Sequence, residues 1–223
     1  MKQNNWAVFA FEFLAVVIGI VITFAGEALI TSHNEQEDVK NSLQLVKDEL
    51  QDNLGYIQEA DSLIELDGEA ARFLIQFIDR YDEAPQDSLY YYCNYPMYIY
   101  TFYNTSQALE LLKNSSIFSK IKDKSLALDI IHAYGNIEEY IRLKRSYLEK
   151  KANLVDAAIT DDLKKALSEP HITAQKFWKT ITSTTAGVYL LHELRISNSM
   201  NSSSEHVQDI TTSTIKKIDL YCE

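Results

Sequence analysis

The pattern of apolar and polar positions divides the chain into one long apolar stretch near its start and a series of amphipathic segments after it. The apolar stretch covers residues 6–30 and reads WAVFAFEFLAVVIGIVITFAGEALI. As a helix it would be roughly 37 Å long, whereas the hydrocarbon core of a bilayer is roughly 30 Å thick. The stretch therefore predicts a transmembrane helix, and we expect residues 1–31 to form a single-pass membrane anchor.

Two glutamates lie inside this apolar stretch. Only residues 13–26 separate Glu12 from Glu27, and that segment is too short to span a bilayer. Any membrane span in this stretch must therefore include at least one of the two glutamates. An ionised carboxylate in the hydrocarbon core costs about 3 kcal/mol on insertion scales. We therefore expect Glu12 to be protonated, paired or turned toward a wet seam, and Glu27 to reach the headgroup region.

Small residues share one face of the predicted transmembrane helix with the first glutamate. The residues of this predicted packing face are Glu12, Ala15, Gly19, Thr23, Gly26 and Glu27. Small residues four positions apart let two helix backbones approach closely. Two interpretations follow: the face packs against another transmembrane helix, in a homo-oligomer or in a membrane-protein partner, or the helix is a lone anchor whose first glutamate lies near the headgroups.

Basic residues bear on the fate and the orientation of the apolar stretch. A cleaved signal peptide would use Lys2 as its basic region and Thr23-x-Ala25 as its cleavage site, but the apolar region is long and the basic region is weak.

The orientation of the span follows from the basic residues on its two sides. Lys2 lies close before the stretch, whereas the first basic residues after it are Lys40 and Lys47. Because basic residues favour the cytoplasmic side, a cytoplasmic amino terminus and an exported body are predicted.

Amphipathic segments fill the rest of the chain. Their apolar residues recur at steps of three and four, which is the period of a helix with one buried face. The chain also contains only six glycines and three prolines. Residues 32–223 therefore predict an all-α domain, an elongated antiparallel helical bundle into which the transmembrane helix continues. The predicted helices cover residues 34–66, 69–81, 104–113, 124–168, 173–197 and 205–221.

The apolar stripe of residues 34–66 has two interpretations. It could form a parallel coiled coil that continues a transmembrane oligomer, or it could pack within its own chain. Asn53 takes a d-like position and makes the heptads imperfect, which favours packing within the chain. Gly68 is expected to separate this helix from the next one.

Residues 89–103, LYYYCNYPMYIYTFY, are unusually rich in tyrosine. Three interpretations are open: an aromatic layer that caps or joins helices, a recognition surface for a partner, or a segment at the level of lipid headgroups. The residues of the predicted interaction surface are Tyr90, Tyr91, Tyr92, Tyr95, Tyr98, Tyr100 and Tyr103.

The charge and the motifs of the chain narrow its chemistry. The formal net charge is −11, which makes nucleic acid and anionic headgroups poor partners. The chain contains no metal-binding His or Cys spacing, no phosphate-binding loop and no Gly-x-Ser-x-Gly elbow. We therefore expect no cofactor, no metal, no catalytic residues and no enzymatic activity, although an enzyme built from distant residues is a weaker alternative. Whether Cys93 and Cys222 pair does not follow from the sequence.

Several segments together resemble a large uncharacterised family of bacterial single-pass membrane proteins with an amino-terminal E-x-x-L-V-V-I-G-I span and a helical body. The segments are Glu12-Phe-Leu-Ala-Val-Val-Ile-Gly-Ile-Val-Ile, Leu50-x-x-Asn53-Leu54, Thr105-Ser106, Leu111-Leu112-Lys113-Asn114-Ser115, Ile121-Lys122-Asp123 and Tyr134. The resemblance covers roughly residues 4–150 and implies an inner-membrane protein of Gram-negative bacteria with a periplasmic body. This chain departs from the family in lacking a basic leader before the span.

These observations predict a non-enzymatic, membrane-anchored helical protein that acts as an assembly or interaction subunit. It would act through the small-residue face of its transmembrane helix and through its acidic helical body. The alternative is an oligomeric membrane effector or an ion- or proton-conducting subunit in which Glu12 lines the path.

Overall fold

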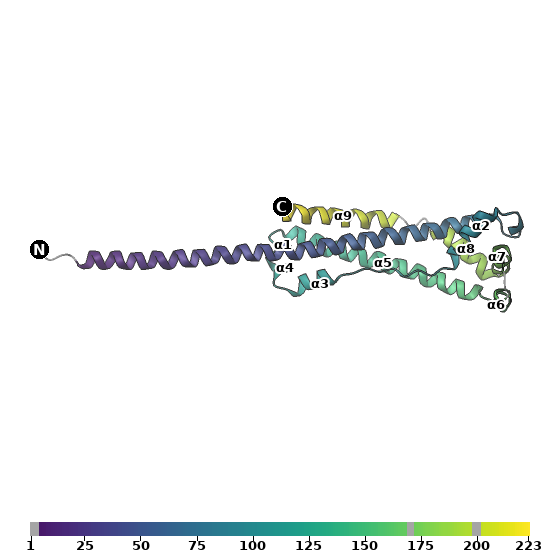
Figure 1. The fold of residues 1–223 in the computed structure, drawn as a ribbon, viewed down its shortest axis with the longest axis horizontal. Coiled ribbons are helices and arrows are strands. Elements are labelled where there is room, and N and C mark those ends of the chain that lie inside the picture. The colour runs from purple at the N-terminus through teal and green to yellow at the C-terminus, as the bar shows by residue number, and fades with distance from the viewer. Residues whose placement is uncertain (1–4, 169–171, 198–201) are drawn as a thin grey trace.

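The computed structural model describes residues 5–168, 172–197 and 202–223, and the side chains of residues 5–16, 24–33, 197, 202 and 203 lie outside this description. Every regular element in these ranges is a helix, and none is a strand. The prediction of an all-α fold is therefore confirmed. The elements form a long rod whose first part is a single helix and whose second part is a bundle (Figure 1).

One helix, α1 (Asn5–Gln76), runs through 72 residues and sets the length of the rod. At 1.5 Å per residue it is roughly 108 Å long. The predicted break at Gly68 is wrong, because the predicted helix 34–66 and the first part of the predicted helix 69–81 belong to this one element, which ends at Gln76. An interior glycine costs a helix only about 1 kcal/mol. The buried side chains of Ile64 and Ala71 hold the helix in the core on both sides of Gly68.

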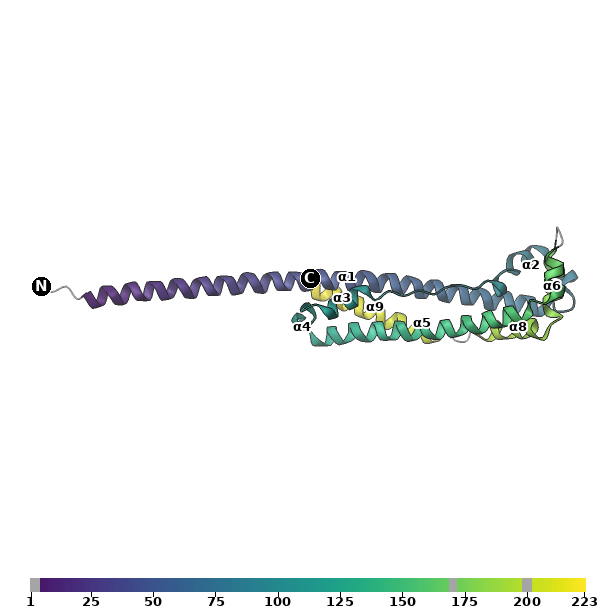
Figure 2. The same cartoon turned by 90° about the horizontal axis from the view of Figure 1, so that it is seen from below.

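The first part of α1 projects beyond the bundle, and no other helix lies beside it in either view (Figures 1 and 2). The first buried apolar side chain described on α1 is Val39. Within the described part of the chain, no helix combines the length and the apolar character that crossing a membrane requires. The anchor at residues 1–31 therefore stays a prediction.

After α1 the chain turns at the far end of the rod and runs back along it. This return contains η1 (Tyr81–Glu83), α2 (Gln86–Tyr92), η2 (Tyr95–Met97), a stretch without regular structure at 98–106, α3 (Gln107–Asn114) and α4 (Ile117–Lys120). Asn53 donates a hydrogen bond to the Thr105 carbonyl and accepts one from the Thr105 amide, each 2.8 Å long. These bonds, rather than the packing of a helix, hold this part of the return against α1. Of the predicted helices, the one at 104–113 lies in the return, and it corresponds to α3.

The third pass is α5 (Lys124–Ala158), which runs parallel to α1. Ion pairs show this direction, because Asp61 of α1 pairs with Lys144, and Asp67 pairs with Lys151 further along both helices. The last pass consists of α8 (Thr185–Ser197) and α9 (Ser202–Cys222), which follow one another and each pack against both α1 and α5. The predicted antiparallel arrangement thus holds between α1 and the last pass, whereas α1 and α5 are parallel.

Two predicted helices are each divided by a threonine cap. The predicted helix 124–168 consists of α5 and α6 (Asp161–Leu167), because the chain leaves α5 at Ile159 and Thr160 then accepts a hydrogen bond from the Leu163 amide of α6. The predicted helix 173–197 consists of α7 (Ala174–Thr182) and α8, because Thr184 accepts a hydrogen bond from the Gly187 amide. Gly187 permits this turn, since a Cβ there would lie 2.1 Å from the Ile181 carbonyl oxygen.

The bundle has two apolar clusters along its length. The cluster nearer the projecting helix joins α1 to α3, α5 and α9, and the far cluster joins the end of α1 to α2, α5, α7 and α8. The α1 stripe is buried in the first cluster, where Val39, Leu43 and Leu50 are fully buried. The interpretation that this stripe packs within its own chain is therefore confirmed.

Candidate functional site

A fully buried ion pair marks the boundary between the two apolar clusters. The Lys151 ammonium lies 2.6 Å from an Asp67 carboxylate oxygen, and both side chains are 0% exposed. Tyr147 of α5 donates a second hydrogen bond to the same carboxylate, 3.0 Å long, and Tyr100 of the return segment donates a third, 3.4 Å long. Neither charged side chain is exposed to solvent, so the pair joins α1 to α5 inside the core.

Burial dominates the electrostatics of this layer. Desolvation raises the pKa of Asp67, and the charge of Lys151 opposes that rise. Desolvation also lowers the pKa of Lys151, against the attraction of Asp67. The phenols of Tyr100 and Tyr147 have raised pKa values, first because they are buried and second because the Asp67 carboxylate is near. Each group in the layer therefore depends on its partners to be tolerated in the core.

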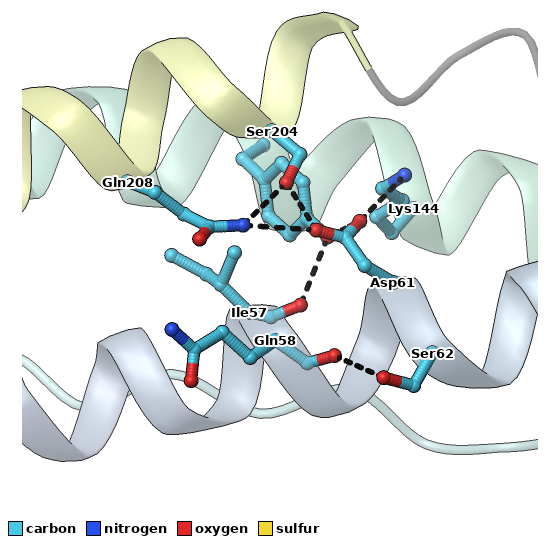
Figure 3. Close-up of polar contacts among 8 residues, drawn as sticks. Ile57, Gln58, Asp61, Ser62, Lys144, Ser204 and Gln208 are labelled. Atoms are coloured by element: carbon cyan, nitrogen blue, oxygen red, sulfur yellow. Dashed lines mark hydrogen bonds and ion pairs between the residues drawn. The ribbon is translucent and has the colours of Figure 1, made fainter.

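A second polar layer lies closer to the projecting helix. Figure 3 shows Asp61 of α1 between Lys144 of α5 and the first turns of α9. Its carboxylate accepts hydrogen bonds from the Tyr140 hydroxyl at 2.7 Å, the Gln208 amide at 3.2 Å and the Ser204 hydroxyl, with the Lys144 ammonium 3.5 Å away. This layer fastens the start of α9 to both long helices.

The two layers are built from a repeated unit on α5. Tyr140 and Lys144 have the same four-residue spacing as Tyr147 and Lys151, seven positions later, which is close to two helical turns. Each tyrosine–lysine pair therefore points from one face of α5 to one aspartate of α1. The sequence contains this signal, because tyrosine and lysine recur on a stripe of α5 that is otherwise apolar.

Lys151 also fixes the tyrosine-rich segment on the bundle. Its ammonium donates hydrogen bonds to the carbonyl oxygens of Tyr95 at 3.0 Å and Tyr98 at 2.7 Å. The indole of Trp178, from α7, donates to the Cys93 carbonyl at 3.1 Å. Three backbone carbonyls of a segment with little regular structure are thus held by buried side chains.

The structure divides the predicted tyrosine surface into exposed and buried members. Tyr90, Tyr91, Tyr98 and Tyr103 are exposed, Tyr92 and Tyr95 are half-buried, and Tyr100 is buried. The buried and half-buried members fit the aromatic-layer interpretation, whereas the recognition surface for a partner stays a prediction that rests on the exposed members. The segment lies beside Asp67, roughly 55 Å along α1 from Ile30. If residues 6–30 cross a membrane, the segment therefore lies too far away to be at the level of the lipid headgroups.

Some of these tyrosines enclose an open pocket of about 340 Å³. Its lining residues are Tyr91, Asn94, Tyr95, Tyr98 and Tyr100. The rings form two tilted pairs, with centroids 5.7 Å apart for Tyr91 and Tyr95 and 5.0 Å apart for Tyr98 and Tyr100. We call this the tyrosine pocket, and it carries no charged side chain in its lining.

A second pocket, of about 500 Å³, lies between α3 and α5. Its lining mixes both charges, with Lys113 and Arg145 beside Glu110 and Glu138. Tyr134 also lines it, but the Tyr134 hydroxyl is buried and finds no hydrogen-bond partner among the described residues. The mixed lining favours no single ligand, so the tyrosine pocket is the better defined of the two.

The predicted packing face on the apolar stretch is described in part. Thr23 donates a hydrogen bond to the Gly19 carbonyl, 2.9 Å long, and a Cβ at Gly19 would meet nothing within 4 Å. The remaining members of the face are Glu12, Ala15, Gly26 and Glu27, whose side chains lie outside the described residues. The tyrosine surface and this face lie toward opposite ends of α1 and do not form one site.

The two cysteines, Cys93 and Cys222, are not joined by a disulfide. Among the described residues, no group of three or more His, Cys, Asp or Glu side chains could hold a metal ion.

Comparison of the chain with models of known families, with curated proteins and with solved structures finds no match in any of the three. The resemblance to the bacterial single-pass membrane family therefore stays a prediction.

Proposed function

We propose that this chain is a non-enzymatic, membrane-anchored interaction subunit. The apolar start of α1 would cross the inner membrane once, and the rest of α1 would carry the acidic bundle away from it on the periplasmic side. The tyrosine pocket would then present a docking surface for a partner protein roughly 55 Å from the bilayer.

The observation that carries this proposal is the exposed apolar surface on the projecting part of α1. Ile18, Val21 and Ile22 are 50%, 59% and 64% exposed, with Val17 and Ile20 exposed as well. Successive helical residues are about 100° apart, so these five side chains spread over roughly 200° of the circumference. A helix with so wide an apolar surface is stable against the core of a large protein or in a bilayer, and no other described element packs around this part of α1.

The gap in that apolar circumference falls at Gly19 and Thr23. The Thr23 hydroxyl is already satisfied by the Gly19 carbonyl, as a hydroxyl in hydrocarbon needs to be. The open space beside Gly19 suits close approach of one neighbouring helix. We therefore place the contact with a second copy, or with a membrane-protein partner, on the face that carries Gly19 and Thr23, while lipid covers the rest.

Carbonate extraction of bacterial membranes tests the anchor with the full-length chain. We expect the protein to stay in the membrane pellet, and a Val17→Lys/Val21→Lys variant to move to the supernatant, because each charge at the centre of a span costs about 3 kcal/mol. Leu45→Lys is the matched control, since Leu45 is an exposed apolar residue of α1 within the bundle. Extraction of the unmodified protein by carbonate would overturn the anchor.

A further inference from the structure

We infer that the tyrosine pocket binds a cationic side chain of a protein partner, with arginine as its preferred occupant. This inference rests on the proposed interaction role of the bundle and adds the chemistry that the partner must supply.

The lining of the tyrosine pocket selects for positive charge. Four tyrosines and one asparagine line it. Aromatic ring faces carry the negative part of the ring quadrupole, so several rings around one space form a cage that attracts a cation. Both tilted ring pairs, Tyr91 with Tyr95 and Tyr98 with Tyr100, contribute their rings to this lining. The net charge of −11 on the whole chain favours approach of a basic partner in addition.

The structure already contains one ammonium on a ring of this pocket. The Lys151 nitrogen lies 4.7 Å from the centroid of the Tyr100 ring, on the buried side of the segment. The 2.6 Å contact with Asp67 balances the Lys151 charge. Lys151 therefore does not present an uncompensated charge that would repel a second cation in the pocket.

Oxygen atoms in the pocket suit a guanidinium better than an ammonium. The Tyr95 phenol is hydrogen-bonded to Tyr91, which raises the pKa of Tyr95, so the two phenols lie side by side. The Asn94 side-chain amide adds an acceptor to the lining. A planar guanidinium stacks on tyrosine rings while its five N–H groups donate to oxygens at the edge, which a compact ammonium does less well.

Exposure around the pocket favours a protein over a small molecule. The chain neighbours Tyr90 and Ile99 are 80% and 41% exposed, and Tyr98 itself is 62% exposed. Exposed aromatic and apolar residues next to a cation-binding pocket are typical of protein interfaces, where tyrosine and arginine are both enriched. Hydrogen bonds from the buried Lys151 and Trp178 side chains hold the pocket in shape before binding, which lowers the ordering cost.

A peptide titration followed by NMR tests this inference on the full-length protein in detergent, with carbon-13-labelled tyrosine rings. The probes are glycine-flanked peptides with a central arginine, lysine or citrulline, the last being neutral but almost the same shape as arginine. We expect the arginine peptide to shift the Tyr95 ring signals, the lysine peptide to shift them less, and the citrulline peptide to leave them unchanged.

Two leucine substitutions locate the binding. Tyr98→Leu removes a lining ring and is expected to weaken arginine-peptide binding by about fivefold or more. Tyr103→Leu is the matched control, because Tyr103 is also 62% exposed but does not line the pocket. Both variants are checked for unchanged thermal unfolding. Equal binding of the citrulline peptide, or equal binding by Tyr98→Leu, would overturn the inference. Because this readout does not depend on the bilayer, its failure is separate from a failure of the anchor.

Discussion

Lys150 and Lys151 are neighbours in the sequence, but the fold gives them opposite environments. Lys151 pairs with Asp67 in the core, whereas Lys150 pairs with Glu193 at the surface and is 53% exposed. Removing one member of a buried pair leaves an uncompensated charge in the core, whereas an exposed pair contributes little. The two positions therefore form a matched test of the buried layer.

We expect Lys151→Met to lower the free energy of unfolding by roughly 3–5 kcal/mol, and Lys150→Met to change it by less than about 1 kcal/mol. Urea unfolding followed by circular dichroism measures both. A Lys151→Met/Asp67→Leu double variant should recover much of the loss, because it leaves no charge unpaired. Equal effects of the two single variants would contradict the structural role given to this layer.

Tyr81 offers a test of pH dependence at a single phenol. Its hydroxyl is buried and forms no hydrogen bond of good geometry among the described residues; burial raises its pKa to about 12, and the nearby Thr182 side chain opposes that rise. The folded protein therefore keeps the phenolic proton to higher pH than the unfolded chain, whose tyrosines ionise near about pH 10. The stability linked to this proton is complete below about pH 10 and is lost as the pH rises toward 12.

We expect Tyr81→Phe to stabilise the protein by roughly 1 kcal/mol near neutral pH, because it removes an unsatisfied buried hydroxyl. The advantage should grow above about pH 10, by at most about 1.4 kcal/mol per pH unit. Urea unfolding at about pH 8 and about pH 11 measures the difference. Tyr98→Phe, at an exposed position, should show no such growth. A Tyr81→Phe advantage that stays constant with pH would contradict the buried state of this phenol.

Among elements, the turn between α7 and α8 is the one that depends most on a single residue. The Gly187 backbone approaches Ile181 so closely that a Cβ would lie 2.1 Å from its carbonyl oxygen, whereas a Cβ at Gly55 in α1 would meet nothing within 4 Å. We expect Gly187→Ala to destabilise the protein by roughly 1–3 kcal/mol through this overlap. Gly55→Ala should stabilise it by up to about 1 kcal/mol, because alanine favours a helix. Thermal unfolding of both variants checks the opposite signs.

Helix boundaries were harder to predict than helix content, and the reasons are local. Periodicity located the apolar stripes of α1, α5 and α9, because their buried faces repeat over many turns. Gly68 resembles a break because the sequence does not show the packing on both sides of it. The caps at Thr160 and Thr184 do not follow from the sequence, because a threonine inside a periodic stripe does not by itself show that the chain leaves the helix there.

At the scale of the molecule, the sequence predicted a rod of helices but not the order of its passes. The return segment was hardest, because its 98–106 stretch is held by side chains such as Asn53 and Lys151 rather than by its own periodicity. The candidate site was predicted in part, because most of the pocket residues belong to the predicted tyrosine surface. The contributions of Asp67, Lys151 and Asn94 could not be predicted, because these residues lie on three passes of the chain that come together only in the fold.

The unbroken course of α1 makes the molecule a mechanical lever. Residue 5 and residue 76 belong to one helix, and the last third of that helix supports the layer under the tyrosine pocket. Because no break in the helix separates the two ends, a tilt of the apolar end displaces the other end. Tilting the helix by about 10° would sweep the pocket through roughly 10 Å, so if the apolar end crosses a bilayer as proposed, the thickness of that bilayer would set how far the arm reaches.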